Sequence, residues 1–233
     1  MSSTRKGKRH GGELDDFPTP RWCVHRLLEC KELILPSGLW IEPCAGAGNI
    51  IRGVNEVRDD ISWHANELNP VYEEALLKFV RTPLVRIGDV LTFDIDHSAK
   101  VIITNPPFCI AEDVLHRCMM VPGAVVVILQ RLNWCAGPRS EIFRQFKPSV
   151  FVLPQRPSFR DVYTTDPKTG KTRMSSTDSI EYAWFVFDWR GHFTMLADTP
   201  DEVRAAEKKE RRALEKKPTI LESNALDTSS AAG

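Results

Sequence analysis

The sequence lacks an excess of charge of either sign. Its 233 residues include 31 Lys and Arg and 31 Asp and Glu, which gives a formal net charge of zero at neutral pH. No global positive field is therefore available to attract a polyanion, and any nucleic-acid binding must depend on local basic patches. Hydrophobic runs of membrane-spanning length are also absent, and the basic, polar start has no apolar core typical of a secretion signal. We expect a soluble, cytoplasmic protein that does not bind a membrane.

Cysteine pairs with the spacing of metal ligands are missing as well. No Cys-x-x-Cys motif occurs among the six cysteines, and several of them lie within apolar runs. This pattern favours reduced, mostly buried thiols over a zinc site or a disulfide framework. We therefore expect no metal cofactor.

The sequence does contain short apolar strands that alternate with amphipathic helices. Strands are predicted over residues 39–44, 61–65, 84–87, 101–104, 124–129, 150–153 and 182–187. Helical spacing of apolar residues predicts helices over residues 20–35, 50–57, 71–80, 111–120 and 139–146. Thr19 is the expected N-cap of the first helix. Alternation of this kind predicts an α/β three-layer sandwich with a mainly parallel sheet.

Polar and charged segments border this predicted domain. Residues 1–16 are expected to form a disordered basic arm, and residues 197–233 a charged helix with a disordered tail. The domain itself is predicted over residues 17–196. Within it, the polar segment between Phe159 and Glu181 is expected to be a mobile surface loop.

The stretch VIITNPPF, residues 101–108, predicts a strand that ends in a rigid turn, because two consecutive prolines cannot donate to a sheet. The prolines hold the Asn105 side chain and the Pro106 carbonyl in fixed relative positions. Both groups offer acceptors, so the expected guest is an amide or exocyclic NH2, with Phe108 flat against its ring. Asn-Pro-Pro is alternatively an ordinary loop, since both residue types are common in turns.

A glycine-rich turn follows the first predicted strand. Gly46 and Gly48 fit a dinucleotide-binding turn, but Ile51 stands where the third glycine of such a site is expected. Glu42, at the end of the strand, is a poor neighbour for a pyrophosphate and a good one for an α-amino group. S-adenosylmethionine fits this turn better than a dinucleotide.

Two further acidic residues end the next two predicted strands, at the general ligand position of open α/β sheets. Glu67 is placed to accept both ribose hydroxyls, and Asp89 to accept from the adenine amine beside the Val90 backbone. Taken singly, each acid is equally an ordinary helix cap or surface charge. Their order along the chain favours a common cofactor site.

These motifs have the order found in a known class of enzymes. FPTP, EPCAGAG, NEL, GDV and NPPF, within residues 17–108, resemble the motifs of class I methyltransferases that modify amino groups, especially N6-adenine DNA methyltransferases. LQRLNW, LPQRPSF and YAWFVFD, within residues 129–188, are similar to segments of small phage and prophage adenine methyltransferases. One departure is Glu42, because this family commonly has Asp at that position.

The resemblance implies the Rossmann-like class I methyltransferase fold, with a mostly parallel seven-stranded sheet and one antiparallel strand. It implies S-adenosylmethionine as the cofactor, DNA as the partner, and transfer to the N6 amine of a flipped-out adenine. The catalytic motif would be Asn105, Pro106, Pro107 and Phe108. The implied cofactor-binding residues are Phe17, Thr19, Pro20, Glu42, Pro43, Ala45, Gly46, Gly48, Glu67, Leu68, Asp89 and Val90.

The resemblance also assigns the aromatic and basic residues that would meet the substrate. Phe108 and Phe159 would stack on the two faces of the target base, although Phe159 fits a plain loop-core aromatic equally well. The residues expected to border DNA are Arg156, Lys168, Lys171 and Arg173.

Two alternatives to this function stay open. A methyltransferase acting on RNA bases or on glutamine amides of proteins can also use an Asn-Pro-Pro-aromatic motif. A non-catalytic, cofactor-binding partner subunit is the other alternative, and the presence of NPPF together with all three acids argues against it. The recognised DNA sequence and the oligomeric state cannot be read from these residues.

Overall fold

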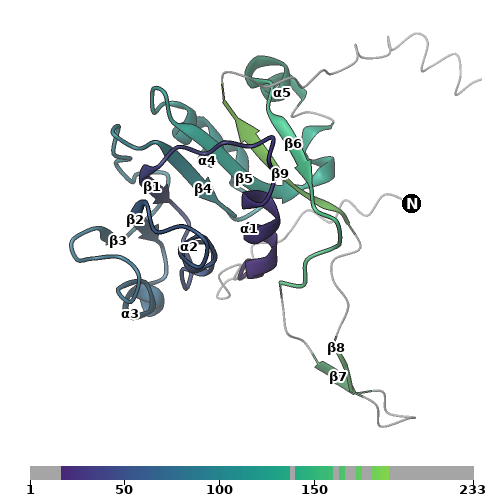
Figure 1. The fold of residues 1–233 in the computed structure, drawn as a ribbon, viewed down its shortest axis with the longest axis horizontal. Helices are drawn as coiled ribbons and strands as arrows, with labels where there is room; N and C mark the ends of the chain where they lie inside the picture. Colours follow the sequence, from purple (N-terminus) through teal and green to yellow (C-terminus); the bar gives the residue numbers. More distant parts are fainter. Residues whose placement is uncertain (1–16, 137–139, 160–162, 166–171, 175–179, 189–233) are drawn as a thin grey trace, which may run out of the picture. The chain divides into compact units, whose positions relative to one another are not determined.

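A computed structural model describes residues 17–136, 140–159, 163–165, 172–174 and 180–188. Its centre is a seven-stranded sheet in the order β3-β2-β1-β4-β5-β9-β6 (Figure 1). The strands are β1 (Gly38–Glu42), β2 (Ile61–Glu67), β3 (Val85–Ile87), β4 (Val101–Thr104), β5 (Val125–Arg131), β6 (Ser149–Val152) and β9 (Tyr182–Phe187). β9 runs antiparallel to both of its neighbours, and the remaining pairs are parallel. The prediction of one antiparallel strand in a mostly parallel sheet is confirmed.

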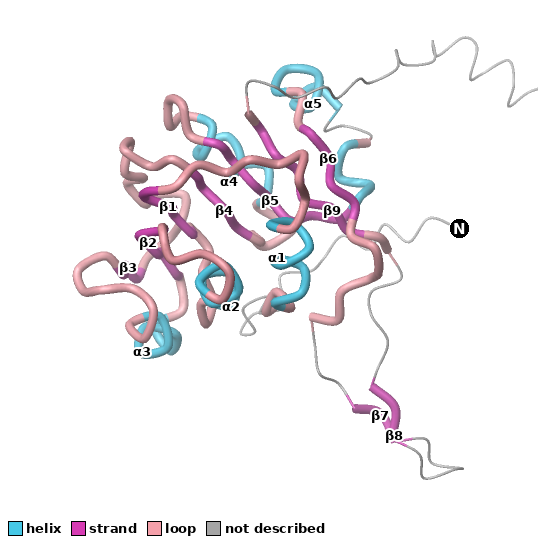
Figure 2. The backbone as a smooth tube through the Cα atoms, viewed as in Figure 1, coloured by secondary structure: helices cyan, strands magenta, loops and turns pink. Residues whose placement is uncertain are grey.

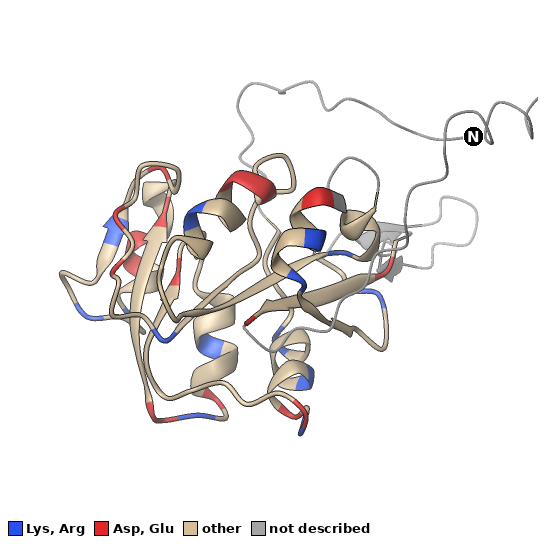
Figure 3. Cartoon of the chain, turned by 90° about the horizontal axis from the view of Figure 1, so that it is seen from above, with Lys and Arg blue, Asp and Glu red and all other residues tan. Residues whose placement is uncertain are grey.

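Helices cover both faces of this sheet. They are α1 (Arg21–Leu28), α2 (Asn49–Asn55), α3 (Glu73–Leu76), α4 (Ala111–Met119) and α5 (Ser140–Phe146), with short 3-10 turns η1 (Pro70–Tyr72) and η2 (Leu132–Cys135). Seen from above in Figure 3, helices lie on either side of the sheet, which confirms the predicted three-layer sandwich. α1 and α2 pack together on one face, whereas α4 lies on the other (Figure 1).

Two helix predictions were too long. The first helix ends at Leu28 and not near residue 35. Leu33 and Leu35 follow the turn after this helix and pack against the core from there. These apolar residues are therefore buried without being helical. The predicted helix over residues 71–80 consists only of η1 and α3.

The segment predicted as a surface loop contains a second, small sheet. β7 (Tyr163–Thr165) pairs antiparallel with β8 (Thr172–Met174), and Figure 2 draws them as two short magenta strands. The loop prediction is wrong for these residues, where Tyr and Thr favour extended structure.

The core explains why the central strands read as continuous apolar runs. All residues of β4 are buried, and so are residues 126–130 of β5, because helices cover both faces of these strands. The Trp184 indole N–H donates to the Cys23 carbonyl at 2.9 Å and ties β9 to α1.

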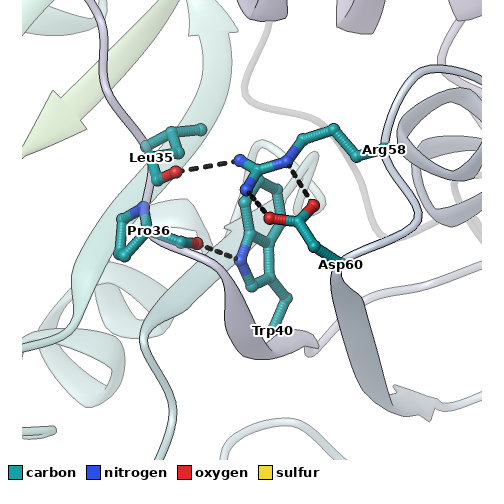
Figure 4. A network of polar contacts seen from close by, with 5 residues as sticks. All are labelled: Leu35, Pro36, Trp40, Arg58 and Asp60. Carbon is teal, nitrogen blue, oxygen red and sulfur yellow. Dashed lines mark hydrogen bonds and ion pairs between the residues drawn. The ribbon is translucent and has the colours of Figure 1, made fainter.

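A cluster around Arg58 fixes the chain where it enters β1 (Figure 4). Its guanidinium donates to the Leu35 carbonyl at 2.9 Å and to both carboxylate oxygens of Asp60 at 2.9 and 2.6 Å. It also lies 5.2 Å from the Trp40 ring centroid, and the Trp40 indole N–H donates to the Pro36 carbonyl at 2.8 Å. The hydrogen bonds from Arg58 lower the pKa of Asp60. This clamp sits at the amino end of β1, opposite Glu42.

Several sequence expectations concern parts of the chain with little or no description. Residues 1–16 and 197–233 lie outside the described residues, and contacts divide the chain into Met1–Thr194 and Met195–Gly233. None of the helices in the described part is long and apolar enough to span a membrane.

All six cysteines are free thiols, but only Cys23 and Cys118 are buried and Cys109 is exposed, so the prediction of mostly buried cysteines was too broad.

Candidate functional site

A cleft of about 860 Å³, partly open to solvent, lies where the first four strands of the sheet end. The turns after β1, β2, β3 and β4 line it, together with the residues that precede α1. The predicted site residues found in its lining are Phe17, Thr19, Glu42, Pro43, Ala45, Gly46, Glu67, Leu68, Asp89, Val90, Asn105 and Pro107. The topology thus gathers predicted site residues that are up to 90 positions apart in the sequence, from Phe17 to Pro107.

Glu42 is the most deeply buried charge-bearing residue of this cleft. Only 1% of it is exposed, and its Oε2 atom is buried without a hydrogen-bond partner among the described residues. Burial raises the pKa of Glu42 well above its ordinary value, and the nearby Glu67 adds to the rise, while a backbone hydrogen bond from Ile51 opposes it. A buried carboxyl oxygen without a hydrogen-bond partner is costly, and a ligand that donates a hydrogen bond to it would remove that cost. A cationic amino group is the best such donor, because it also favours the charged form of Glu42.

Glu67 fixes the glycine turn as well as lining the cleft. Its Oε2 accepts from the Gly46 N–H at 2.7 Å, and its Oε1 accepts from the Asn69 N–H at 2.8 Å. Each carboxylate oxygen has a second lone pair, so these bonds leave acceptor capacity for a ligand. Glu67 therefore joins the ends of β1 and β2 in one polar arrangement.

Asn66 is a site residue for which the sequence suggested no role. It is 1% exposed, and its Nδ2 donates to the carbonyls of Pro43 and Gly88 at 3.0 and 3.1 Å. These bonds hold together the turns that follow β1 and β3. Its position directly after the strand predicted over residues 61–65, beside Glu67, was the available signal.

The two glycines of the turn have different tasks. Both have positive φ, +51° for Gly46 and +79° for Gly48. Open space surrounds the position of a Cβ at Gly46, whereas a Cβ at Gly48 would lie 3.2 Å from Leu76. Gly46 lines the cleft, but Gly48 does not and instead allows α3 to pack closely.

Asp89, which follows β3, accepts a hydrogen bond from the backbone. Asp89 is exposed, and its Oδ1 accepts from the Leu91 N–H at 2.9 Å. Val90 is 6% exposed and lines the cleft beside it. Both residues lie where the sequence placed them, on the rim farthest along the sheet from β4.

Asn105 has a defined amide orientation. Its Nδ2 donates to the Phe17 carbonyl and to the Thr19 hydroxyl, each at 3.1 Å. Since these bonds use both amide protons, the side-chain oxygen is left as the acceptor that faces away from them. Thr19 does not cap α1, whose N-cap residue is Pro20 without a side-chain hydrogen bond, and Pro20 does not reach the cleft.

The carbonyl of Pro106 is also held in place. It accepts from the Nε2 of Gln130 at 3.3 Å, in a buried contact between β5 and the turn after β4. Gln130 lies in the segment that carries the family resemblance, but no role was predicted for it. Pro106 itself is buried and does not line the cleft.

An aromatic cluster adjoins Asn105. Phe17 stacks on Phe108 with centroids 5.6 Å apart and an interplanar angle of 20°, and it meets Phe159 edge-on at 6.1 Å. Phe159 packs edge-on against Tyr182 at 5.0 Å and is 7% exposed. Phe108 is more exposed than Phe159, but its ring also contacts Tyr182, with centroids 6.1 Å apart.

Two arginines lie near this cluster. The Arg131 guanidinium is 4.6 Å from the Phe108 ring centroid, and its Nε donates to the Tyr182 hydroxyl at 3.3 Å. Arg156 is exposed and donates to Glu181 at 3.1 and 2.7 Å. Of the other predicted DNA-binding residues, Arg173 lies on β8 opposite Thr164, and residues 168 and 171 lie outside the described residues.

Comparison with known proteins establishes the fold. No protein-family model matches the chain, and no curated protein matches it. Among solved structures, a precorrin-6y C5,15-methyltransferase from Geobacter metallireducens has a TM-score of 0.50 at 14% identity, over 76% of this chain and 92% of that chain. A dimethyladenosine transferase from Plasmodium falciparum has a TM-score of 0.47 at 8% identity, over 73% and 62% of the two chains. The first likeness and the strand order show the Rossmann-like class I methyltransferase fold, and at this identity they show the fold alone.

Proposed function

We propose that the protein transfers a methyl group from S-adenosylmethionine to the exocyclic N6 amine of adenine in DNA. The observation that carries this proposal is the orientation of Asn105 at the junction of two different environments. Asn105 lines the cleft together with Glu42, Glu67 and Asp89, and Phe17, whose carbonyl accepts from its amide, stacks on Phe108 in the aromatic cluster.

The cleft fits S-adenosylmethionine. The orphaned Oε2 of Glu42 suits the amino group of its methionine portion, and Gly46 leaves open space for close approach. Glu67 and Asp89 keep acceptor capacity for hydroxyl and amine donors. When bound, this cofactor supplies a methyl group on a sulfonium, whose C–S bond breaks as the new N–C bond forms.

The residues after β4 handle the substrate amine. The Asn105 side-chain oxygen and the Pro106 carbonyl accept the two N6 hydrogens, which draws the nitrogen out of conjugation and aims its lone pair at the donor. The nitrogen becomes cationic as it reacts and then releases its proton to solvent, so a strong general base is unnecessary. For Phe108 to stack on the adenine ring, Phe17 or Arg131, which both lie against the Phe108 ring, has to move aside. Phe159 likewise needs to leave its packed position to cover the second face.

DNA is favoured as the substrate by the segments over residues 129–188 that resemble phage and prophage adenine methyltransferases. The four predicted basic contacts belong to this same half of the chain. They would bind phosphates without reading sequence.

The test is methyl transfer by the purified full chain to DNA, RNA and protein in parallel, followed by digestion and mass spectrometry. We expect N6-methyladenine in DNA, and methylation confined to RNA bases or to glutamine would overturn the substrate assignment. Asn105→Ala should abolish transfer and leave cofactor affinity within a few fold, as measured by calorimetry. Asn133→Ala, at an exposed position of η2, is the matched control and should keep full activity.

A further inference from the structure

Gln130 is one of the few polar side chains buried within the described strands of the sheet. The four residues before it in β5 are buried and apolar, and it is itself only 2% exposed, paired with Ala183 of β9. A primary amide in such surroundings is costly unless it forms hydrogen bonds. An apolar side chain would fill this strand position at lower cost, so the amide needs another explanation.

The hydrogen bond of Gln130 points to that explanation. Its Nε2 donates to the Pro106 carbonyl oxygen at 3.3 Å. Pro106 has no N–H, so this carbonyl is its sole backbone hydrogen-bonding group. A carbonyl oxygen has two lone pairs, and a donor that occupies one of them sets the direction in which the other points.

We infer that Gln130 is a positioning residue for the transfer reaction, an inference that rests on the proposed function. It holds the Pro106 carbonyl so that the free lone pair meets one hydrogen of the substrate amine. Thr19 and the Phe17 carbonyl do the same for Asn105 from the opposite end of the sequence. Each of the two acceptors that grip the amine therefore has its own supporting contact.

Replacement of the donor should affect the reaction more than binding. Gln130→Met keeps the length of the side chain but cannot donate, so the Pro106 carbonyl loses the contact that holds it within the narrow range that the two prolines allow. Small misplacements of a reacting group reduce rates strongly, and we expect kcat to fall about tenfold to a hundredfold. The cofactor Kd should change by less than about threefold, because Gln130 does not line the cleft. The affinity for a duplex carrying 2-aminopurine as the target base should also change by less than about threefold, because that base has no N6 amine for the Pro106 carbonyl to accept from.

Val127→Ala provides the matched control on the same strand. Val127 is fully buried and lies opposite Val186 of β9. This change should lower the urea midpoint of unfolding and leave kcat unchanged. If Gln130→Met, like Val127→Ala, lowers the urea midpoint of unfolding and leaves kcat unchanged, the residue is merely structural and the inference is overturned.

Gln130→Glu adds a pH profile that a structural role would not produce. A protonated carboxyl can donate to the Pro106 carbonyl, whereas a carboxylate cannot. The transfer rate of this variant relative to the unaltered protein should therefore rise as pH falls from 8 to 6. A flat ratio overturns the inference, and this variant carries the test if Gln130→Met does not fold.

The two hypotheses fail in different ways. Absence of transfer by the unaltered protein to any amine substrate, despite cofactor binding, refutes the proposed function. Normal transfer by the unaltered protein together with a kcat for Gln130→Met within twofold of it refutes only the role of Gln130.

Discussion

Replacing Thr19 with valine removes one of the two acceptors that hold the Asn105 amide, with almost no change in side-chain volume. Thr19 is 3% exposed, and its hydroxyl accepts from Asn105 at 3.1 Å. A net hydrogen bond is worth about 1 kcal/mol, and a buried donor left without a partner costs about 1–3 kcal/mol. We expect the free energy of unfolding of Thr19→Val to fall by about 1–2 kcal/mol.

The same change should slow the reaction through the orientation of Asn105. With one amide proton unpaired, the side chain can rotate and present its NH2 where the oxygen now lies. A donor at that point repels a substrate amine. A loss of about 1.4 kcal/mol of transition-state stabilisation corresponds to about a tenfold lower rate, which we expect for single-turnover methyl transfer.

The assay is a double-mutant cycle in urea. Thr19→Val, Asn105→Ala and the double variant should show a coupling energy of about 1 kcal/mol, because the second change has no bond left to remove. Thr92→Val is the control, since the Thr92 hydroxyl donates to the Asp89 carbonyl at 3.1 Å at an exposed position. It should be nearly neutral in both assays.

Additive effects of the Thr19 and Asn105 changes would refute this reasoning. Additivity would mean that the two side chains do not share a hydrogen bond in solution, and that some other contact orients the amide. A normal transfer rate in a destabilised Thr19→Val variant would separate the two claims, by retaining the bond and rejecting its role in orientation.

Four further predictions concern the cleft and its surroundings. Glu42→Gln should weaken cofactor binding at least about tenfold, as expected for loss of a charge-assisted bond. Because the pKa of Glu42 is raised above 4.5 in the folded protein, the stability of the cofactor-free protein should decline as pH rises through that raised pKa, and urea titrations of Glu42→Gln should lack this decline. Gly46→Ala and Gly48→Ala each force an alanine into the left-handed conformation, which costs about 1–2 kcal/mol of stability. Gly48→Ala should be the less stable variant, because its Cβ would also press against Leu76. Gly46→Ala should weaken cofactor binding more, as measured by calorimetry, because Gly46 lines the cleft. Arg156→Glu should raise the Kd for DNA and reduce the slope of log K against log salt by about one per lost phosphate contact. An unchanged slope would exclude Arg156 from the interface. The same prediction and test apply to Lys168, Lys171 and Arg173.

The strands could be predicted because the physics that forms them is local. Helices on both faces make β4 and β5 almost continuously apolar up to Thr104 and Gln130, and the Pro106-Pro107 pair ends β4 whatever its neighbours are. The end of α1 could not be predicted in this way. Leu33 and Leu35 keep helical spacing although they reach the core from a turn, and only the packed structure distinguishes these cases.

The acids of the cleft could be predicted for a related reason. Glu42 and Glu67 close strands that lie side by side and run parallel, so a correct topology brings their ends together. The direction of each hydrogen bond depends instead on contacts between distant segments. The bond from Asn105 to Phe17 joins residues 88 positions apart, and nothing local to either residue indicates it.

The zero net charge of the chain is compatible with a DNA substrate because the charges near the site are separated. Glu42 and Glu67 line the cleft together with Asn105, where they attract a cationic cofactor and would repel a phosphate. Arg131 does not line the cleft and lies against the Phe108 ring and the Tyr182 hydroxyl. Under the proposed function, we therefore expect the phosphate of the nucleotide to lie near Arg131 and away from the two acids. The amine is then the part of the substrate that comes closest to the cleft, where Asn105 and the methyl donor meet it.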